Sequence, residues 1–199
     1  MLAEGFAYQG EVSQHAGEPR GVDSTQQPPV AFVDFIQNHD QVGNRAQGDR
    51  LISLAGADRT RVMLATLLLS PHIPLLFMGE EYGETNPFLF FTDFHGDLAK
   101  AVREGRTREF EGHAGHEGED VPDPNDPETF TRSQLDWTRP HSVEGQRWLA
   151  FSVNCSHCAS STLCRCYAAR PASRARLSPP RPVLSPCAGR CRRARSPWR

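Results

Sequence analysis

The chain has 199 residues, with 22 basic against 24 acidic side chains and a formal net charge of −2. Its 38% hydrophobic and 23% charged residues favour a soluble globular protein of one ordinary domain or two small ones over a disordered chain. The N-terminus MLAEGFAYQGEVS lacks the features of a signal peptide, and no apolar run approaches the ~20 residues of a membrane span. We therefore expect a cytoplasmic protein with no membrane partner.

Charge and cysteine are unevenly distributed along the chain. Residues 152–199 contain 10 Arg but no Lys, Asp or Glu, so residues 1–151 carry 12 basic against 24 acidic groups. All six Cys also lie beyond Phe151, and the cysteine-free remainder fits a reducing cytosol. We predict three segments: a loop over 1–29, a folded part over 30–151, and a disordered Arg/Cys/Pro-rich tail over 152–199. An out-of-frame reading of a GC-rich gene would give a tail of this composition.

The first predicted strand is residues 30–36 (VAFVDFI). Its nearly continuous apolar, β-favouring residues are typical of a central parallel strand that is covered on both faces. A polar turn, Asn-His-Asp, follows at 38–40. Asp58 is a plausible N-cap for a helix over 59–70 (RTRVMLATLLLS), which Pro71 ends.

A second short apolar strand is predicted over residues 72–78, followed by the polar residues Glu80, Glu81 and Tyr82. The order strand, polar turn, helix, strand, polar turn is that of a parallel βαβ unit and predicts an α/β fold. Further along, residues 96–110 are predicted to form a charged surface helix. The Gly-, Asp- and Pro-rich stretch 111–127 is predicted to be an exposed loop, and another helix is expected to begin near Ser142.

Both predicted strands end in polar clusters. In parallel α/β folds, ligands bind beyond the carboxyl ends of the strands, where the loops converge. The Asn-His-Asp turn therefore has two interpretations: a structural turn, which the turn propensities of Asn and Asp favour, or the rim of an active site. The same two interpretations, a solvated turn or a rim site, apply to Glu80 and Glu81.

Several motifs in the same order carry a family resemblance. FIQNHDQVGNRAQGDRL and, some thirty residues later, IPLLFMGEEYGETNPFLFFTDF resemble the α-amylase superfamily of glycoside hydrolases, together with EGFAYQGEVS upstream and SQLDW downstream. The resemblance covers roughly residues 4–151 and is strongest to the trehalohydrolase branch of that superfamily. It implies a partial TIM (β/α)8 barrel in which 32–40 and 73–78 belong to the seventh and eighth strands.

The resemblance also implies roles for individual residues. Asp40 matches the carboxylate that stabilises the transition state, and His39 matches an imidazole that hydrogen-bonds sugar hydroxyls. An anion beside the ring suits an oxocarbenium-like transition state, and a neutral imidazole can both donate to and accept from a diol. The further substrate-binding residues that the resemblance implies are Asn38, Gln41, Val42, Gly43, Asn44, Arg45, Glu80, Glu81 and Tyr82.

The implied substrate is a malto-oligosaccharide ending in trehalose, cleaved without a metal or other cofactor. Two carboxyl groups that a retaining glycosidase needs, the nucleophile and the general acid, have no recognisable motif here. We therefore expect a C-terminal part of a barrel that is inactive alone and whose partner is a missing N-terminal half. The alternatives are another enzyme of the superfamily, an amylase or a branching enzyme, and a non-catalytic carbohydrate-binding remnant.

Three other groups of residues could be assigned to different functions. Cys155, Cys158, Cys164 and Cys166 could hold zinc, but the Cys-x-Cys spacing of the second pair argues against it. The arginines of the tail could bind nucleic acid, but no aromatic-interleaved motif accompanies them. His113 and His116 lie among acidic residues in a Gly-rich stretch, which favours a solvated surface over a metal site.

Overall fold

The computed structural model describes residues 5–110 and 121–163. At its centre lie two parallel strands, β1 (Val33–Asp34) and β2 (Ile73–Pro74), in which Val33 is paired with Ile73. Three helices, α1 (His39–Gly43), α2 (Leu51–Ala55) and α3 (Ala57–Leu68), connect the two strands. The predicted parallel βαβ unit is thus confirmed, although neither α1, where a polar turn was predicted, nor α2 was predicted as a helix.

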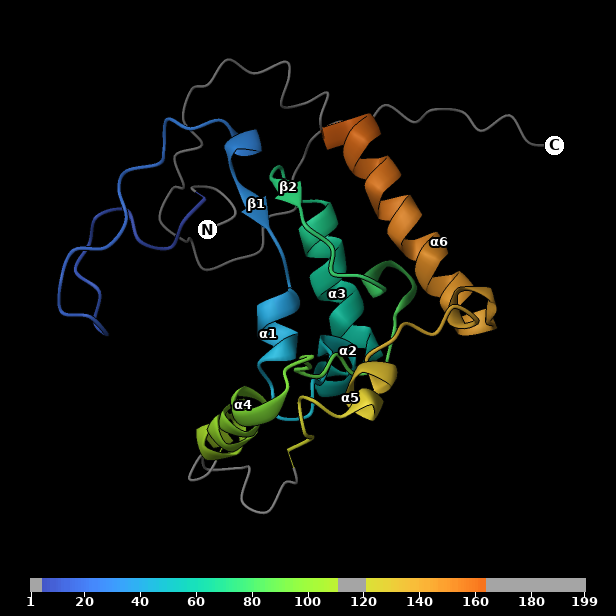
Figure 1. Ribbon diagram of the computed structural model, residues 1–199. Coiled ribbons are helices and arrows are strands. Elements are labelled where there is room, and N and C mark those ends of the chain that lie inside the picture. The colour runs from blue at the N-terminus through green and yellow to red at the C-terminus, as the bar shows by residue number, and fades with distance from the viewer. Residues whose placement is uncertain (1–4, 111–120, 164–199) are drawn as a thin grey trace.

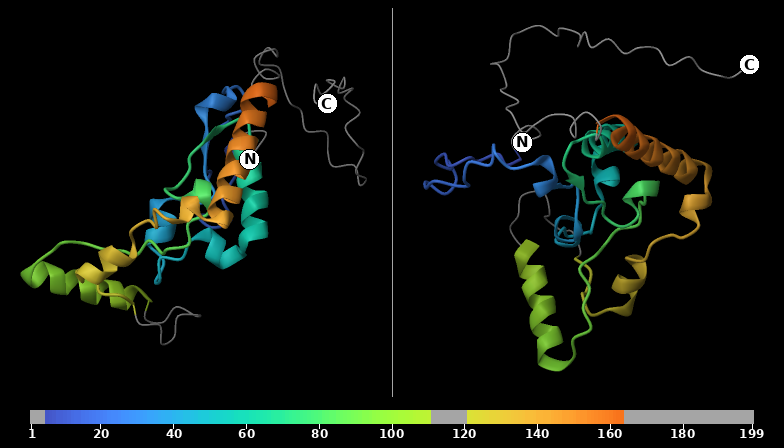
Figure 2. Two further views of the ribbon diagram at one scale, coloured as in Figure 1. Left: turned by 90° about the vertical axis from the view of Figure 1, so that its right-hand side faces the viewer. Right: turned by 90° about the horizontal axis from the view of Figure 1, so that it is seen from above.

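The remaining elements complete the described part of the chain. They are the 3-10 turns η1 (Pro29–Ala31), η2 (Glu80–Tyr82) and η3 (Arg139–His141), the helices α4 (Gly96–Phe110), α5 (Pro127–Arg132) and α6 (Val143–Cys158), and the π-helical turn η4 (Ala159–Leu163). Figures 1 and 2 show α3 and α6 side by side next to the strand pair, with α4 and α5 at the end where α1 lies. None of the helices in the described ranges is long and apolar enough to cross a membrane.

Both strands are shorter than predicted and less covered. Over 30–36 only Val33 and Asp34 form a strand, and over 72–78 only Ile73 and Pro74 do. Val33 is 54% exposed and Ile73 is 46% exposed, so the prediction of a strand covered on both faces is wrong for this structure. The reason is that each strand has one neighbour within the described residues, so neither the outer backbone edges nor these side chains are covered.

One helix starts at a different residue from the prediction, and two start where they were predicted. Helix α3 covers 57–68 and begins after Gly56, whose φ of +82° makes the sharp turn from α2, so Asp58 lies in the first turn and is not the cap. Helix α4 occupies the predicted residues, and α6 begins where expected, because the Ser142 hydroxyl accepts a hydrogen bond from the Gly145 N–H at 3.0 Å.

Helix α6 continues through the expected domain boundary at Phe151. The hydrophobic core consists of Leu64, Leu67 and Leu68 of α3 packed against Trp148 of α6, and Phe151 and Cys155 pack against it as well. These α6 positions repeat at helical spacing, so the apolar stripe carries the helix onward to Cys158. The prediction of a disordered tail is therefore wrong over 152–163, where α6 and η4 lie, and residues 164–199 lie outside the described ranges.

Candidate active site

The polar turn after β1 forms the first turn of helix α1. Asn38 is the N-cap, with extended backbone, and its side-chain Oδ1 accepts a hydrogen bond from the Gln41 N–H at 2.8 Å. This cap places His39 and Asp40 in the first turn of the helix, and both side chains are exposed. The amide of Asn38, which we expected to bind substrate, thus already uses its oxygen to start the helix.

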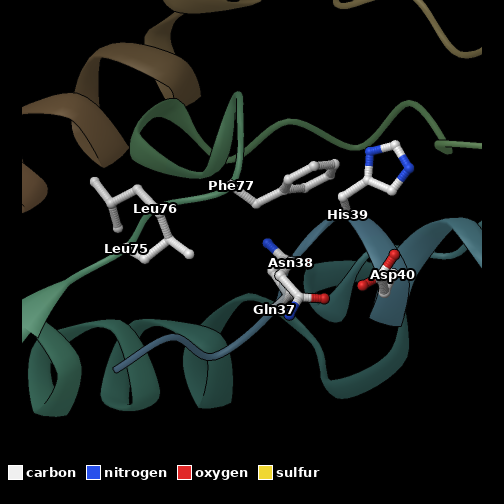
Figure 3. Close-up of a pocket in the computed structure, with 7 residues that line it drawn as sticks. All are labelled: Gln37, Asn38, His39, Asp40, Leu75, Leu76 and Phe77. Carbon is white, nitrogen blue, oxygen red and sulfur yellow. The ribbon is translucent and has the colours of Figure 1, made fainter. Parts of the chain in front are cut away.

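His39 and Asp40 face an open depression of about 280 Å³ beyond the strands. Its lining residues come from the two strand ends: Gln37, Asn38, His39, Asp40, Leu75, Leu76 and Phe77. Figure 3 shows the Phe77 ring extending from the β2 side toward His39, with the Asp40 carboxylate beside it on α1. The depression lies at the carboxyl ends of two neighbouring parallel strands, which is the usual position of a ligand site in such folds.

Aromatic rings hold the imidazole of His39. The ring of Phe88 meets it edge to face at a centroid distance of 4.9 Å, and Phe88 also contacts Phe77 at 5.3 Å. Phe88 can reach this position because Gly48, at φ +58°, lies directly against its backbone, where any Cβ would clash. The Phe88 N–H donates to the Gly48 carbonyl at 2.9 Å, so the loop after α1 and the loop after β2 together orient His39.

A layer of buried charged side chains lies under the site. Arg50 is 1% exposed; its Nε donates to the Asn86 carbonyl at 2.6 Å, its Nη1 donates to the Met78 carbonyl at 2.8 Å, and its guanidinium stacks over Phe77 at 5.1 Å. Glu84 is 2% exposed and accepts backbone N–H groups from residues 85, 86 and 136 at 2.7–2.8 Å. This layer fixes the backbone that follows β2.

Glu80 is the least satisfied member of that layer. It is 4% exposed, and its Oε2 accepts the Phe77 N–H at 2.9 Å, whereas its Oε1 has no hydrogen-bond partner among the described residues. Burial raises the pKa of Glu80 to about 7, against the smaller lowering effects of Phe77, Gln37 and Arg50. Burial likewise lowers the pKa of Arg50, in opposition to the nearby acidic groups. Burial raises the pKa of the neighbouring Tyr82 to about 12.

The structure distributes the expected site residues over four locations. Asn38, His39 and Asp40 line the depression, while Gln41, Val42 and Arg45 line a second depression of about 300 Å³, and Gln37 lines both. Gly43 and Asn44 lie at the end of α1. The last group, Glu80, Glu81 and Tyr82, forms η2, in which Glu80 and Tyr82 are buried and Glu81 is half-buried. Glu80 and Tyr82 are therefore buried and do not lie at the rim of the site, where we expected them.

Sequence reasoning missed Arg50 and Glu84, because nothing in the neighbouring sequence indicates that these charged side chains are buried. Among the described residues, no group of three or more His, Cys, Asp or Glu side chains could hold a metal ion. Cys155 and Cys158 are free thiols on α6, whereas Cys164, Cys166, His113 and His116 lie outside the described ranges.

Comparison with known proteins shows what this chain is similar to. No protein-family model matches the sequence. A crystal structure from Salmonella typhimurium, provisionally described as an alpha amylase, superimposes with a TM-score of 0.79 and 71% identity over 86% of this chain and 29% of that one. The chain is thus a homologue of α-amylase-type glycoside hydrolases.

The particular relatives are malto-oligosyltrehalose trehalohydrolases. Those of Brevibacterium helvolum, Rhizobium sp. and Deinococcus radiodurans are 43%, 44% and 43% identical over 152, 152 and 150 residues. These matches cover 75%, 75% and 74% of this chain but 26%, 25% and 25% of the relatives. The chain is therefore homologous to malto-oligosyltrehalose trehalohydrolase, as the motifs predicted, and spans about a quarter of its length.

Proposed function

We propose that this chain forms the last two strands, with their helices, of a trehalohydrolase barrel. In that barrel it takes part in hydrolysing the α-1,4 bond next to the terminal trehalose of maltooligosyl trehalose. The observation that carries the proposal is the placement of His39 and Asp40 on the depression beyond two parallel strands. The identity to curated trehalohydrolases supports the choice of substrate. The cysteine-free residues 1–151 suit a cytoplasmic enzyme.

The chemistry assigns separate roles to the two side chains. Cleavage of a glycoside passes through an oxocarbenium-like state, and the Asp40 carboxylate supplies a fixed negative charge near the sugar ring. The His39 imidazole, oriented by Phe88, binds sugar hydroxyls and fixes the ring against that charge. In this proposal Asp40 stabilises the transition state and does not form a covalent bond to the sugar.

Hydrolysis needs two further carboxyl groups. Among the described residues that line the depression, Asp40 alone carries a carboxylate. Glu80 and Glu84 are buried, and Glu80 Oε2 and both carboxylate oxygens of Glu84 accept backbone N–H groups of the chain itself, so neither is proposed to contact a substrate. We therefore propose that the nucleophile and the general acid come from another polypeptide segment and that this chain alone does not turn over substrate.

The exposed apolar side chains of the strands support a missing partner. Val33, Phe35, Ile73, Leu75 and Met78 are between 39% and 54% exposed, and all lie on β1, on β2 or directly beyond them. Additional parallel strands would cover these side chains and use the open backbone edges. The proposed partner is thus the N-terminal half of the barrel. Nucleic-acid binding is not proposed, and the arginine-rich residues 164–199 lie outside the described ranges.

One observation supports a second function. The Salmonella structure that is 71% identical to this chain is provisionally described as an alpha amylase, so the alternative substrate is an ordinary α-1,4-glucan with no trehalose end. A branching enzyme would transfer the glucan chain rather than hydrolyse the bond, and a non-catalytic carbohydrate-binding remnant would bind the glucan without cleaving it.

Reconstitution separates these possibilities. The chain would be co-expressed with the upstream part of a curated trehalohydrolase, and the complex would be incubated with maltooligosyl trehalose or with a maltooligosaccharide of equal length. We expect free trehalose from the first substrate and little product from the second. Maltose and glucose from the second substrate would establish an amylase. If the complex assembles and binds the sugar but forms no product, the chain is a carbohydrate-binding remnant, and the proposed function is contradicted.

A further inference from the structure

A buried arginine of helix α4 contacts the end of the helix that carries His39 and Asp40. Arg106 is 6% exposed, although α4 is otherwise a charged helix whose side chains face solvent. Its Nη2 donates to the Gly43 carbonyl at 3.1 Å and to the Arg45 carbonyl at 3.0 Å. Residues 43 and 106 are far apart in sequence, so these bonds tie two separate segments together at the site.

The guanidinium is held on several sides. It stacks over the ring of Phe90 at 4.9 Å and over that of Phe110 at 4.6 Å, and its Nη1 donates to the Glu109 carboxylate at 2.8 Å. Arg106 thus approaches α1 in a fixed orientation, because its planar group is stacked between rings and hydrogen-bonded to Glu109 at one edge.

One of the two carbonyls that Arg106 binds, that of Gly43, is of the kind that a helix end leaves without a partner, whereas the Arg45 carbonyl lies beyond α1 and also accepts the Gly48 N–H at 3.2 Å. Gly43 is the last residue of α1, and the last carbonyls of a helix have no N–H donor within the helix. Gly43 is buried, so a carbonyl deprived of Arg106 would lose a charge-assisted hydrogen bond where water does not easily replace it. Helix α1 is only five residues long, so its C-terminal end lies one turn from His39 and Asp40.

We propose that Arg106 is a positioning residue for the candidate active site, which holds α1 so that His39 and Asp40 present their side chains to the depression. The functional part of this inference rests on the proposed glycosidase activity. The structural part, that Arg106 keeps helix α1 ordered, does not depend on that activity. The alternative is that Arg106 only adds to the general stability of the fold.

Amide hydrogen exchange of the whole chain distinguishes a role of Arg106 in positioning α1 from a contribution to general stability. Arg106→Met removes the donors but keeps a long side chain, and Arg106→Lys keeps a charge and a single donor group. Arg108→Met is the matched control, because Arg108 is exposed on the same helix and its Nε donates only within α4, to the Glu104 carbonyl. The reporters are the amides of Asn44 and Arg45, which are hydrogen-bonded to the Asp40 and Val42 carbonyls.

In Arg106→Met we expect exchange at these two amides to accelerate about tenfold, the order of effect that follows when a buried carbonyl loses its donor. Exchange at Leu64 and Leu68 in the α3 core should stay within about twofold of the wild type, because they open separately. We also expect the imidazole resonances of His39 to shift as its contact with the Phe88 ring loosens. Arg106→Lys should give an intermediate result and Arg108→Met should match the wild type.

Uniform acceleration throughout the chain would show that Arg106 contributes only general stability, and unchanged exchange at α1 would show that it contributes nothing there. Either result overturns the inference. If Arg106→Met does not fold, hydrogen exchange at the Asn44 and Arg45 amides is compared between Arg106→Lys and Arg108→Met instead, and the same outcomes apply. In the reconstituted enzyme, Arg106→Met should lower kcat more than Arg106→Lys does. If the reconstituted wild-type complex shows no activity, the proposed function is contradicted. The hydrogen-exchange result still tests the structural part of the inference.

Discussion

The buried carboxyl of Glu80 makes the stability of the chain depend on pH. Burial raises its pKa from 4.5 to about 7 in the folded state, so the folded state favours the protonated form more than the unfolded state does. This stabilising contribution is fully present below pH 4.5 and is lost as the pH rises through 7. At about 1.4 kcal/mol for each pH unit between the two pKa values, the loss amounts to about 3 kcal/mol in the free energy of unfolding.

Glu80→Gln tests this reasoning, since glutamine has nearly the same shape as a protonated glutamic acid and does not ionise in this range. Urea denaturation of both chains at pH values from 5 to 8 gives the free energy of unfolding of each. The difference between Glu80→Gln and wild type should grow in favour of the variant as the pH rises, and should level off above pH 7. Titrations common to both chains cancel in this difference. A difference that stays constant across the range would refute a raised pKa at Glu80.

Further predictions concern the core and the boundaries of the fold. Leu64→Ala removes a fully buried side chain between α3 and Trp148 and should lower the free energy of unfolding by about 2–5 kcal/mol in urea denaturation, whereas Val62→Ala on the exposed side of α3 should change it by less than about 1 kcal/mol. Equal losses would contradict the assigned core. Truncation after Phe151 should lower the melting temperature, because it removes the packing of Cys155 and the Ser152 hydroxyl that donates to the Glu81 carbonyl at 2.9 Å. An unchanged melting temperature would place the boundary at Phe151 after all.

Local signals were enough to predict several elements. Ser142 caps α6 because its hydroxyl is three residues from a free N–H, and residues 96–110 form α4 from their own helix-favouring composition. The polar turn at 38–40 was predicted beyond β1, and the structure places His39 and Asp40 on a depression there. Each of these features depends on residues close together in sequence.

Features that depend on distant residues were missed. The burial of Arg50 and Arg106 follows from carbonyls and rings contributed by other segments, which a window of sequence does not contain. The strands are short because a strand extends only as far as a neighbour pairs with it. The boundary at Phe151 was misplaced because composition changes there, whereas the stripe of Trp148, Phe151 and Cys155 continues to pack on α3.

The most direct test of the proposed function is trehalose release by the reconstituted complex with and without the Asp40 carboxylate. Asp40→Asn keeps the size of an exposed side chain, so the complex should assemble and melt as the wild type does. Loss of a preorganised transition-state charge should lower kcat by roughly 10²–10³-fold with little change in KM. Trehalose release by Asp40→Asn at the wild-type rate would contradict the assignment of this site.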